Sequence, residues 1–245
     1  VEDPSALITE AFRKVRTNLW FANVDRPLHT ILVTSPNPVE GKSFIAANLA
    51  TAIAQSGRRV ILVDADLRRP RLHRLFQIRP QSGLTQSLLD GDLKGHLLES
   101  PVENLMFLPA GPLPPNPTEL LASQRMADAL EELRRLADVV VVDTVPVLPL
   151  ADSLVLAPRA DGVILVMEAG KTRRAAARQA VESLAHAGAN LVGAVLNKAP
   201  GRDSRYYYYY YYYYYDDTYS NGNGQRRKER RRRKGHRGLP ISLPS

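Results

Sequence analysis

The stretch that decides the fold is Ile31-Leu32-Val33-Thr34-Ser35-Pro36-Asn37-Pro38-Val39-Glu40-Gly41-Lys42-Ser43. A short apolar strand pattern leads through a Pro-rich turn into Gly41-Lys42-Ser43, and the Ala-, Leu- and Ile-rich run 43–56 then predicts a helix that ends near Gly57. A strand, a turn with Gly-Lys-Ser and a helix are the order of a Walker A phosphate loop. In such a loop, N–H groups at the helix start hold phosphate oxygens, the lysine reaches the β and γ phosphates, and the serine binds Mg²⁺.

Two positions of this loop depart from other phosphate loops. The general pattern has Gly or Ala at the place of Pro36, and the partition and cell-division ATPases carry a signature lysine at the place of Asn37. A plain turn that happens to contain Gly41-Lys42-Ser43 is the alternative, but it does not explain the flanking strand and helix. We therefore expect a nucleotide-binding loop that differs from the loop of the partition ATPases.

Apolar runs recur along the first 200 residues and alternate with helical stretches. One predicted helix opens at Asn116-Pro117, an N-cap followed by a first-turn proline, and continues to about Ala137, and another follows Thr172. Continuously apolar strands alternating with helices are typical of a parallel sheet with helices on both faces. The sequence therefore predicts an α/β P-loop NTPase domain over residues 1–200, with ligands beyond the carboxyl ends of the strands. The six expected strands are 31–33, 60–63, 105–108, 139–142, 163–166 and 191–196.

Carboxylates follow two of these strands. The second strand ends in Asp64-Ala65-Asp66-Leu67-Arg68-Arg69-Pro70, and because alternate residues of a strand end face one way, both acids are expected to point toward one site. The alternative is an exposed turn in which two acids and two arginines neutralise each other. Asp143 ends the Val-rich run 139–142, the Walker B arrangement in which a carboxylate holds the Mg²⁺ water shell beside the phosphates. Together with the phosphate loop, these acids predict a Mg²⁺–nucleotide site.

Composition excludes some classes of protein and separates the end of the chain from the rest. The 245 residues contain no cysteine, so the sequence can form neither disulfides nor thiolate metal sites. No apolar run approaches the ~18 residues that a membrane helix needs, and no signal peptide is visible. The segment 226–237 holds nine Lys or Arg and one Glu, a net charge of +8 that equals the net charge of the whole chain. The basic charge is therefore a property of the tail rather than of the predicted domain.

The tail also contains a tyrosine cluster. Ten consecutive tyrosines, 206–215, are followed by two aspartates and Tyr219. Low-complexity drift is one explanation, and a solvent-accessible phosphoacceptor cluster beside a phosphate-transfer site is the favoured one. We expect the tyrosine cluster to occupy 201–224 and a basic disordered tail to occupy 225–245. The expected phosphoacceptors are Tyr206, Tyr207, Tyr208, Tyr209, Tyr210, Tyr211, Tyr212, Tyr213, Tyr214, Tyr215 and Tyr219.

The basic run has three interpretations. Each tyrosine phosphate adds about −1.5 to −2 charges at pH 7, so about four or five phosphates would cancel the charge of +8. One hypothesis is a switch in which the unmodified tail contacts anionic lipid and phosphorylation neutralises or redirects it. A plain solvated tail ranks level with this switch, and nucleic-acid binding, the competing view of any arginine run, is not favoured.

Several segments together resemble the bacterial tyrosine kinases, the P-loop kinases of capsule and exopolysaccharide systems. The run 64–70 is similar to their Walker A′ motif, and Glu10-Ala11-Phe12-Arg13-Lys14-Val15-Arg16 is similar to their Glu-x-x-Arg-x-x-Arg element. Gly111-Pro112-Leu113-Pro114-Pro115-Asn116-Pro117-Thr118-Glu119-Leu120-Leu121 also matches a family segment. The tyrosine run lies where the family has its tyrosine cluster. The resemblance spans roughly residues 4 to 219.

The resemblance implies ATP and Mg²⁺ as ligands and a role for each matching residue. Lys42 and Ser43 are implied to bind the nucleotide phosphates and Mg²⁺. Asp64 is implied to be the base or orienting group for the incoming tyrosine hydroxyl, while Asp66 and Asp143 support Mg²⁺. The expected nucleotide-binding residues are Pro38, Val39, Glu40, Gly41, Lys42, Ser43, Phe44 and Asn197, of which the last either contacts adenine or forms a turn.

The resemblance also implies partners. The family forms a ring in which each tail enters the next active site, so Glu10, Arg13 and Arg16 are implied to join neighbouring subunits; by sequence alone they are a charged helix face at i, i+3 and i+6. Further implied partners are a membrane adaptor or chain-length regulator of polysaccharide export and a cognate tyrosine phosphatase. We expect the chain in the cytoplasm at the inner face of the plasma membrane, held there by that adaptor or by a missing amino-terminal part.

Two departures from the family pattern affect the expected activity. Val39 stands where the family has Gly after Pro38, and glycine tolerates unusual backbone angles and close approach to phosphate whereas a β-branched residue does not. Asp143-Thr144-Val145-Pro146 replaces Asp-Thr-Pro-Pro. We expect an ATP-dependent protein-tyrosine autokinase that phosphorylates its own cluster between subunits and regulates polysaccharide synthesis or export. The alternatives are a catalytically weak or silent nucleotide-binding adaptor of the same system, which Val39 favours, and a partition-type ATPase.

Overall fold

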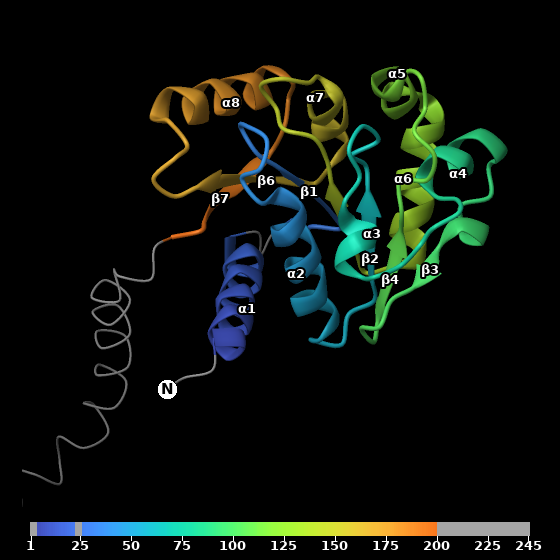
Figure 1. The fold of residues 1–245 in the computed structure, drawn as a ribbon, viewed down its shortest axis with the longest axis horizontal. Coiled ribbons are helices and arrows are strands. Elements are labelled where there is room, and N and C mark those ends of the chain that lie inside the picture. Colours follow the sequence, from blue (N-terminus) through green and yellow to red (C-terminus); the bar gives the residue numbers. More distant parts are fainter. Residues whose placement is uncertain (1–3, 23–25, 200–245) are drawn as a thin grey trace, which may run out of the picture. The chain divides into compact units, whose positions relative to one another are not determined.

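The computed structural model describes residues 4–22 and 26–199, in which helices cover both faces of a seven-stranded sheet (Figure 1). The strand order is β3-β4-β2-β5-β1-β6-β7, and all neighbours are parallel except β3 with β4. The predicted α/β fold with a mostly parallel sheet is therefore confirmed. The strands are β1 (Thr30–Thr34), β2 (Val60–Asp64), β3 (Leu98–Glu99), β4 (Leu105–Leu108), β5 (Val139–Asp143), β6 (Gly162–Glu168) and β7 (Leu191–Asn197).

Six of these strands are the predicted apolar runs, and their side chains explain why the runs are continuously apolar. In β1, Ile31 and Val33 join one hydrophobic core, whereas Leu32 joins a second core on the opposite face of the sheet. Successive side chains of a strand point to opposite faces, so a sheet covered on both sides needs apolar residues at every position. The strand β3 was not predicted, because two residues leave no recognisable pattern.

The helices divide between the two faces. Residues of α1, α2 and α3 pack in the core that contains Ile31 and Val33, and residues of α4, α6, α7 and α8 pack in the core that contains Leu32. Figure 1 shows α1 beside α2, and the two helices are in contact. The helices are α1 (Pro4–Ala22), α2 (Lys42–Ala54), α3 (Leu72–Leu75), α4 (Leu84–Asp90), α5 (Pro117–Ala122), α6 (Gln124–Leu136), α7 (Asp152–Leu156) and α8 (Arg174–His186), with short 3₁₀ turns at Lys94–His96 and Ala157–Arg159.

The prediction of one helix from Asn116 to about Ala137 is wrong in its continuity. The chain becomes extended at Ser123, which ends α5, and its hydroxyl accepts the Met126 N–H to cap α6. Serine is a favoured N-cap because its side chain competes with the backbone for hydrogen bonds. Asn116 does occupy the position before α5, but its side chain donates to Glu119 instead of capping the helix.

Two further predictions concern the membrane and the tail. Among the helices that the structure describes, none is long and apolar enough to cross a membrane. The segments 201–224 and 225–245 lie outside the described residues. The domain division near residue 200 and the expected disorder of the basic segment therefore stay predictions.

A buried ion pair joins the loop after β2 to α5 and α7. Asp152 at the start of α7 is fully buried, and it accepts hydrogen bonds from Arg68 Nε at 2.7 Å and Arg68 Nη2 at 3.0 Å. Thr118 of α5 donates its hydroxyl to the same carboxylate. Burial by itself raises the pKa of Asp152, but the hydrogen bonds from Arg68 and Thr118 outweigh it and hold the pKa below its ordinary value. This contact fixes the position of the loop that carries Asp66.

We predict that Asp152→Asn lowers the free energy of unfolding by about 2 kcal/mol, because removing one partner of a buried pair costs about 3–5 kcal/mol and Arg68 is partly exposed. Urea unfolding at pH 7.5 measures the change, with Asp138→Asn, which breaks the exposed pair with Arg59, as the matched control. The depressed pKa of Asp152 means that its contribution is present above pH 3.8 and is lost as pH falls through the folded value. Equal losses in the two variants would contradict this role.

Candidate nucleotide-binding site

The candidate site lies at the carboxyl edge of the sheet, where β1, β2 and β5 end side by side. The residues of the phosphate loop, 35–41, connect β1 to α2, which begins at Lys42. The parallel strands β2 and β5 pair so that Asp64 stands opposite Asp143. The strand order β2-β5-β1 therefore brings both acidic strand ends beside the phosphate loop, as expected for a ligand site of an open α/β sheet.

The end of the phosphate loop needs glycine at position 41. Gly41 has φ 98°, and a Cβ atom there would lie 2.1 Å from Asn197 Nδ2. Gly41 also accepts the first hydrogen bond of α2, from Ile45 N at 3.0 Å. The peptide N–H groups before Ile45 have no partner within the helix, and together with the helix dipole they favour an anion at this end.

The phosphate loop is held from the other side by residues that follow β6 and β7. The buried carboxylate of Glu40 accepts the Asn37 N–H at 2.8 Å and the hydroxyl of Thr172. Asn197 donates its side-chain amide to the Glu40 carbonyl at 2.9 Å. Lys198 donates to the Val39 carbonyl at 2.8 Å. The shape of the loop is thus set by contacts more than 130 residues away along the chain.

Val39 adopts a backbone conformation that glycine tolerates best, at the position where the resembled family has glycine. Its φ is 68°, in the left-handed region, and its side chain is 75% exposed. A left-handed residue other than glycine costs roughly 1–2 kcal/mol, and β-branched residues are the least suited to it. The strain expected at this position is therefore present in the backbone.

Lys42 reaches between two carboxylates. Its Nζ lies 3.0 Å from Asp66 Oδ2 and 3.7 Å from Asp143 Oδ1, and it donates to the Ser43 hydroxyl at 3.3 Å. Burial lowers the pKa of Lys42, but the charges of Asp143 and Asp66 outweigh it and raise the pKa above its ordinary value. The lysine is therefore a fixed cation at the start of α2, where a phosphate would bind.

Asp143 is a fully buried carboxylate whose oxygens accept no hydrogen bond from any described residue. Burial raises its pKa to about 6, although Lys42 and Ser43 act in the opposite direction. An unsatisfied buried carboxylate is costly, and such groups in native proteins are found where a ligand completes them.

Asp64 and Asp66 lie at different depths in the site. Asp64 is fully buried, and its oxygens accept N–H groups of the following loop, from Asp66 at 3.3 Å and Leu72 at 3.2 Å. Burial, reinforced by the charge of Asp143, raises the pKa of Asp64 well above its ordinary value. Asp66 lies nearer the surface and also accepts the Arg69 N–H at 2.9 Å. The structure therefore brings all three predicted acids around Lys42.

The donor set fits Mg²⁺ held together with a nucleotide. In the described ranges 4–22 and 26–199, no three His, Asp or Glu side chains form a metal site by themselves. Mg²⁺ usually keeps several waters and takes one or two carboxylates plus substrate phosphates. Asp143 with its unsatisfied oxygens and Ser43 beside Lys42 match that requirement, and Asp66 lies within the same group. ATP and Mg²⁺ are thus compatible with the residues present.

The predicted oligomer residues lie on α1. Glu10 and Arg13 form an exposed ion pair at 3.5 Å, whereas Arg16 Nη1 donates to the Ala52 carbonyl of α2 at 2.7 Å. The three residues therefore do not form one free charged face, because Arg16 is tied to its own chain. Phe44, predicted to contact the nucleotide, packs edge-on against Phe12 of α1 with ring centroids 5.9 Å apart. Oligomer contacts and nucleotide contacts of these residues stay predictions.

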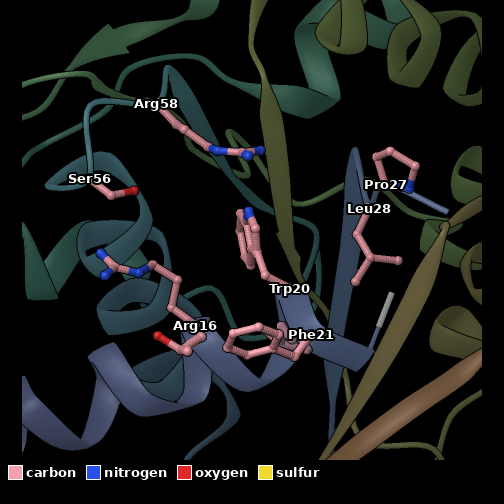
Figure 2. A pocket seen from close by; sticks show the side chains of 9 residues that line it. Arg16, Trp20, Phe21, Pro27, Leu28, Ser56 and Arg58 are labelled. Carbon is pink, nitrogen blue, oxygen red and sulfur yellow. The ribbon is translucent and has the colours of Figure 1, made fainter. Parts of the chain in front are cut away.

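A cavity of about 620 Å³ lies beside Arg16 at the end of α1 (Figure 2). Figure 2 shows Arg58 reaching over Trp20, and its guanidinium lies 4.8 Å from the ring centroid. Phe21 and Leu28 form further walls. This cavity is formed near the amino end of β1, so it is separate from the nucleotide-binding site at the carboxyl edge.

The sequence did not predict the residues after β6 and β7 that support the phosphate loop through hydrogen bonds and ion pairs. Glu168 ends the apolar strand β6 and receives ion pairs from Lys171 and from Lys198, the latter at 2.8 Å. An acid at the end of an apolar strand was a usable signal, since the same pattern identified Asp143. Thr172 and Lys198 offered no local signal. The predicted phosphoacceptors Tyr206–Tyr215 and Tyr219 lie outside the described residues.

A family model described as CobQ/CobB/MinD/ParA nucleotide binding domain matches residues 31–212, more than half of the chain. Fold and site together thus define a P-loop nucleotide-binding domain of this class. The structure of the septum site-determining protein MinD complexed with Mg-ADP, from Pyrococcus horikoshii OT3, has a TM-score of 0.60 with 23% identity over 71% of each chain. At this identity it supports the fold alone.

Relatives with higher identity narrow the class. Tyrosine-protein kinase YwqD of Bacillus subtilis (strain 168) is 42% identical over 196 residues, 80% of this chain and 83% of the relative. The solved kinase domain of Escherichia coli tyrosine kinase ETK has a TM-score of 0.74 with 34% identity, covering 78% of this chain and 77% of that one. The full-length E. coli (strain K12) tyrosine-protein kinase etk is 34% identical, and this chain spans 27% of its length. The chain therefore belongs to the bacterial tyrosine kinase family.

We predict that Val39→Gly raises the free energy of unfolding by about 1 kcal/mol, because it removes about 1–2 kcal/mol of left-handed strain and adds a smaller entropic cost. Urea unfolding of the nucleotide-free protein measures the change. Val181→Gly, an exposed position inside α8 with helical backbone, is the matched control and should lose stability. A loss of stability in both variants would show that Val39 is not strained.

We predict that Asp143→Asn stabilises the protein free of nucleotide and Mg²⁺ while it weakens Mg²⁺–nucleotide binding. The folded pKa of about 6 exceeds the ordinary value of 3.8, so the unfolded chain loses its proton first and wild-type stability falls as pH rises through that window. Asp143→Asn should therefore raise the free energy of unfolding by on the order of 1–3 kcal/mol at pH 7.5 and by less at pH 5. Unfolding in EDTA at both pH values tests this, and destabilisation at pH 7.5 would contradict it.

Proposed function

We propose that this chain is an ATP-dependent protein-tyrosine kinase that phosphorylates its own carboxyl-terminal tyrosine cluster. The observation that carries the proposal is the position of Lys42 at the start of α2, between Asp66 at 3.0 Å and the unsatisfied, buried Asp143 at 3.7 Å. Such a group offers one fixed cation for phosphate and one free carboxylate for Mg²⁺. Relatives that are named tyrosine-protein kinases support the choice of reaction.

The reaction is an in-line transfer of the γ-phosphoryl group. The tyrosine oxygen forms a bond to the γ phosphorus, the bond from that phosphorus to the β–γ bridging oxygen breaks, and ADP leaves. Lys42 neutralises charge on the phosphates, and the N–H groups at the start of α2 orient them. Mg²⁺, held by Ser43, Asp143 and Asp66, supplies further charge neutralisation when it is bound.

Asp64 takes the role of base or orienting group for the tyrosine hydroxyl. Its raised pKa gives it affinity for the proton that the hydroxyl releases. The N–H groups of Asp66 and Leu72 hold its oxygens in place.

The proposal includes transfer between subunits and a place in polysaccharide synthesis or export. The exposed ion pair of Glu10 and Arg13 on α1 is available to a neighbouring subunit, whereas Arg16 would have to leave Ala52 first. One relative is named a putative tyrosine-protein kinase in cps region, from Klebsiella pneumoniae, and one solved neighbour is the chimerical protein CapA2B2, with a TM-score of 0.76 at 34% identity over 81% of this chain and 87% of that one. We infer a membrane adaptor or chain-length regulator, a tyrosine phosphatase, and a cytoplasmic position at the membrane.

A silent nucleotide-binding adaptor is the second candidate, and the left-handed Val39 favours it. A strained, β-branched residue in the phosphate loop limits how closely the backbone approaches a phosphate. The partition-type ATPase has weaker support, because Asn37 replaces the lysine of that class and its amide donates to Glu40 within the loop.

We predict that purified chain incubated with Mg²⁺ and ATP gains phosphate on residues 206–219, and that Lys42→Met slows this by about 10²–10³-fold, the usual loss for one charge-stabilising donor. Intact mass and peptide mapping measure the product. Val39→Gly is expected to act faster than the native chain. Transfer only in Val39→Gly would indicate a kinase silenced at its loop, and ATP binding without transfer in any version would favour the adaptor.

Mixing two defective chains tests transfer between subunits. One chain carries Lys42→Met, and the other carries Phe at all eleven tyrosines of the cluster, so the first lacks the transferring site and the second lacks acceptors. Phosphate on the Lys42→Met chain in the mixture is the expected outcome. Phosphorylation of native chains at a rate independent of their concentration, with none in the mixture, would restrict transfer to a single chain.

A further inference from the structure

A second cleft lies next to the nucleotide-binding site, on the loop that follows β2. Its volume is about 540 Å³, and it is lined by residues of the segment 68–74 and by Gly111, Pro112 and Leu113. The cleft begins close to Asp66, whose Oδ1 accepts the N–H groups of Arg68 at 3.4 Å and Arg69 at 2.9 Å. It is therefore only a few residues from the acids around Lys42.

The cleft is strongly basic and contains no acid among its lining residues. Arg68 is neutralised by Asp152, but the exposed side chains of Arg69, Arg71 and Arg74 form no ion pair or hydrogen bond with any residue in the described part of the chain. Guanidinium groups bind phosphate in bidentate geometry, and a concave site of one charge sign focuses its field. The free arginines thus favour a multiply charged anion such as a phosphate ester.

Part of the cleft lining is apolar. Leu113 is 59% exposed, and the rings of Pro70 and Pro112 line the same cleft. Gly111 before this wall has φ 76°, and a Cβ atom there would lie 2.3 Å from Gln86 Oε1, so the turn is tightly packed on its neighbour. Inorganic phosphate has no apolar surface that could pack against these residues. A phosphate ester with an aromatic ring uses both the arginines and the apolar surface.

We propose that this cleft binds a phosphotyrosine of the chain's own tyrosine cluster while the next tyrosine is phosphorylated. The inference rests on the proposed function, and it names the preferred substrate as a tyrosine segment that already carries phosphate. Residues of an extended chain are about 3.3 Å apart, so in the run 206–215 a modified tyrosine is always within a few residues of an unmodified one. Binding the first product beside the site makes later transfers along the run faster than the first.

The binding step can be tested without turnover. Fluorescence anisotropy in EDTA without ATP compares a labelled peptide of sequence 208–219, phosphorylated at Tyr212, with the same peptide unphosphorylated, on the full-length chain. We expect the phosphorylated peptide to bind at least about tenfold more tightly, and Arg71→Gln with Arg74→Gln to remove about tenfold. Arg79→Gln, an exposed arginine outside the cleft, should change affinity less than about twofold. Equal affinity for both peptides, or no effect of the double variant, would overturn the proposal.

Competitors distinguish phosphotyrosine from other anions. Phenyl phosphate should displace the peptide at lower concentration than inorganic phosphate, and Leu113→Ser should reduce that advantage while leaving displacement by inorganic phosphate unchanged. Equal displacement by the two compounds would reduce the cleft to a general anion site and overturn the proposal. Vesicles of phosphatidylserine that bind through Arg71 and Arg74 while the phosphopeptide does not would identify a lipid site and overturn it as well.

The kinase readout separates this proposal from the proposed function. During Mg²⁺–ATP incubation, we expect native chains to accumulate several phosphates while other chains remain unmodified, and the double variant to accumulate mostly single phosphates at an unchanged initial rate. Phosphopeptide binding through Arg71 and Arg74 in a chain that transfers no phosphate would overturn the proposed kinase function but support phosphotyrosine binding by the cleft. Phosphoryl transfer in a chain that binds the two peptides equally would overturn only the proposal that the cleft binds phosphotyrosine.

Discussion

The structure depends on burying three carboxylates next to one lysine at the carboxyl edge of the sheet. Asp64 and Asp143 end neighbouring parallel strands and stand opposite each other. Burial raises the pKa of both carboxyls, and the charge of Asp143 raises the pKa of Asp64 further. Charges in such surroundings are costly unless they are paired. Lys42 relieves part of that cost. The remainder is left at Asp143, and this is the physical reason to expect a bound metal and nucleotide there.

The phosphate loop holds Lys42 in this place only because other parts of the sheet support it. Glu40 is the central contact, since it binds Asn37 within the loop, Thr172 after β6 and Asn197 at the end of β7. Lys198 adds a contact from Glu168 to the carbonyl of the strained Val39. The strand order β1-β6-β7 places these residues beside the loop. Their network stabilises a loop conformation that a valine would otherwise disfavour.

Under the two proposals, the same edge of the sheet combines a chemical site with a recognition site. The loop after β2 bears Asp66 on one side and the unpaired arginines of the second cleft on the other. Its position is fixed by the pair of Arg68 with the buried Asp152. The acids are suited to Mg²⁺ and to a proton, and the arginines are suited to phosphate esters. In the proposed mechanism, this one loop sets the distance between a reacting tyrosine and a modified neighbour.

The sequence by itself determined six of the seven strands, the start of α2 and the three acids, because apolar runs and Gly-Lys-Ser are local patterns that express strand burial and loop geometry. Its resemblance to the bacterial tyrosine kinases also indicated that position 39 calls for glycine. Only the tertiary structure decided that α5 and α6 separate at Ser123, that Arg16 contacts α2, and that Asp64 lies deeper than Asp66. The sequence also gave no signal for the hydrogen bond from Thr172 to Glu40 or for the basic cleft. The contacts of Arg16 and of Thr172, and the lining of the cleft, join residues far apart in the chain. Such contacts are set by strand order and packing rather than by neighbouring residues.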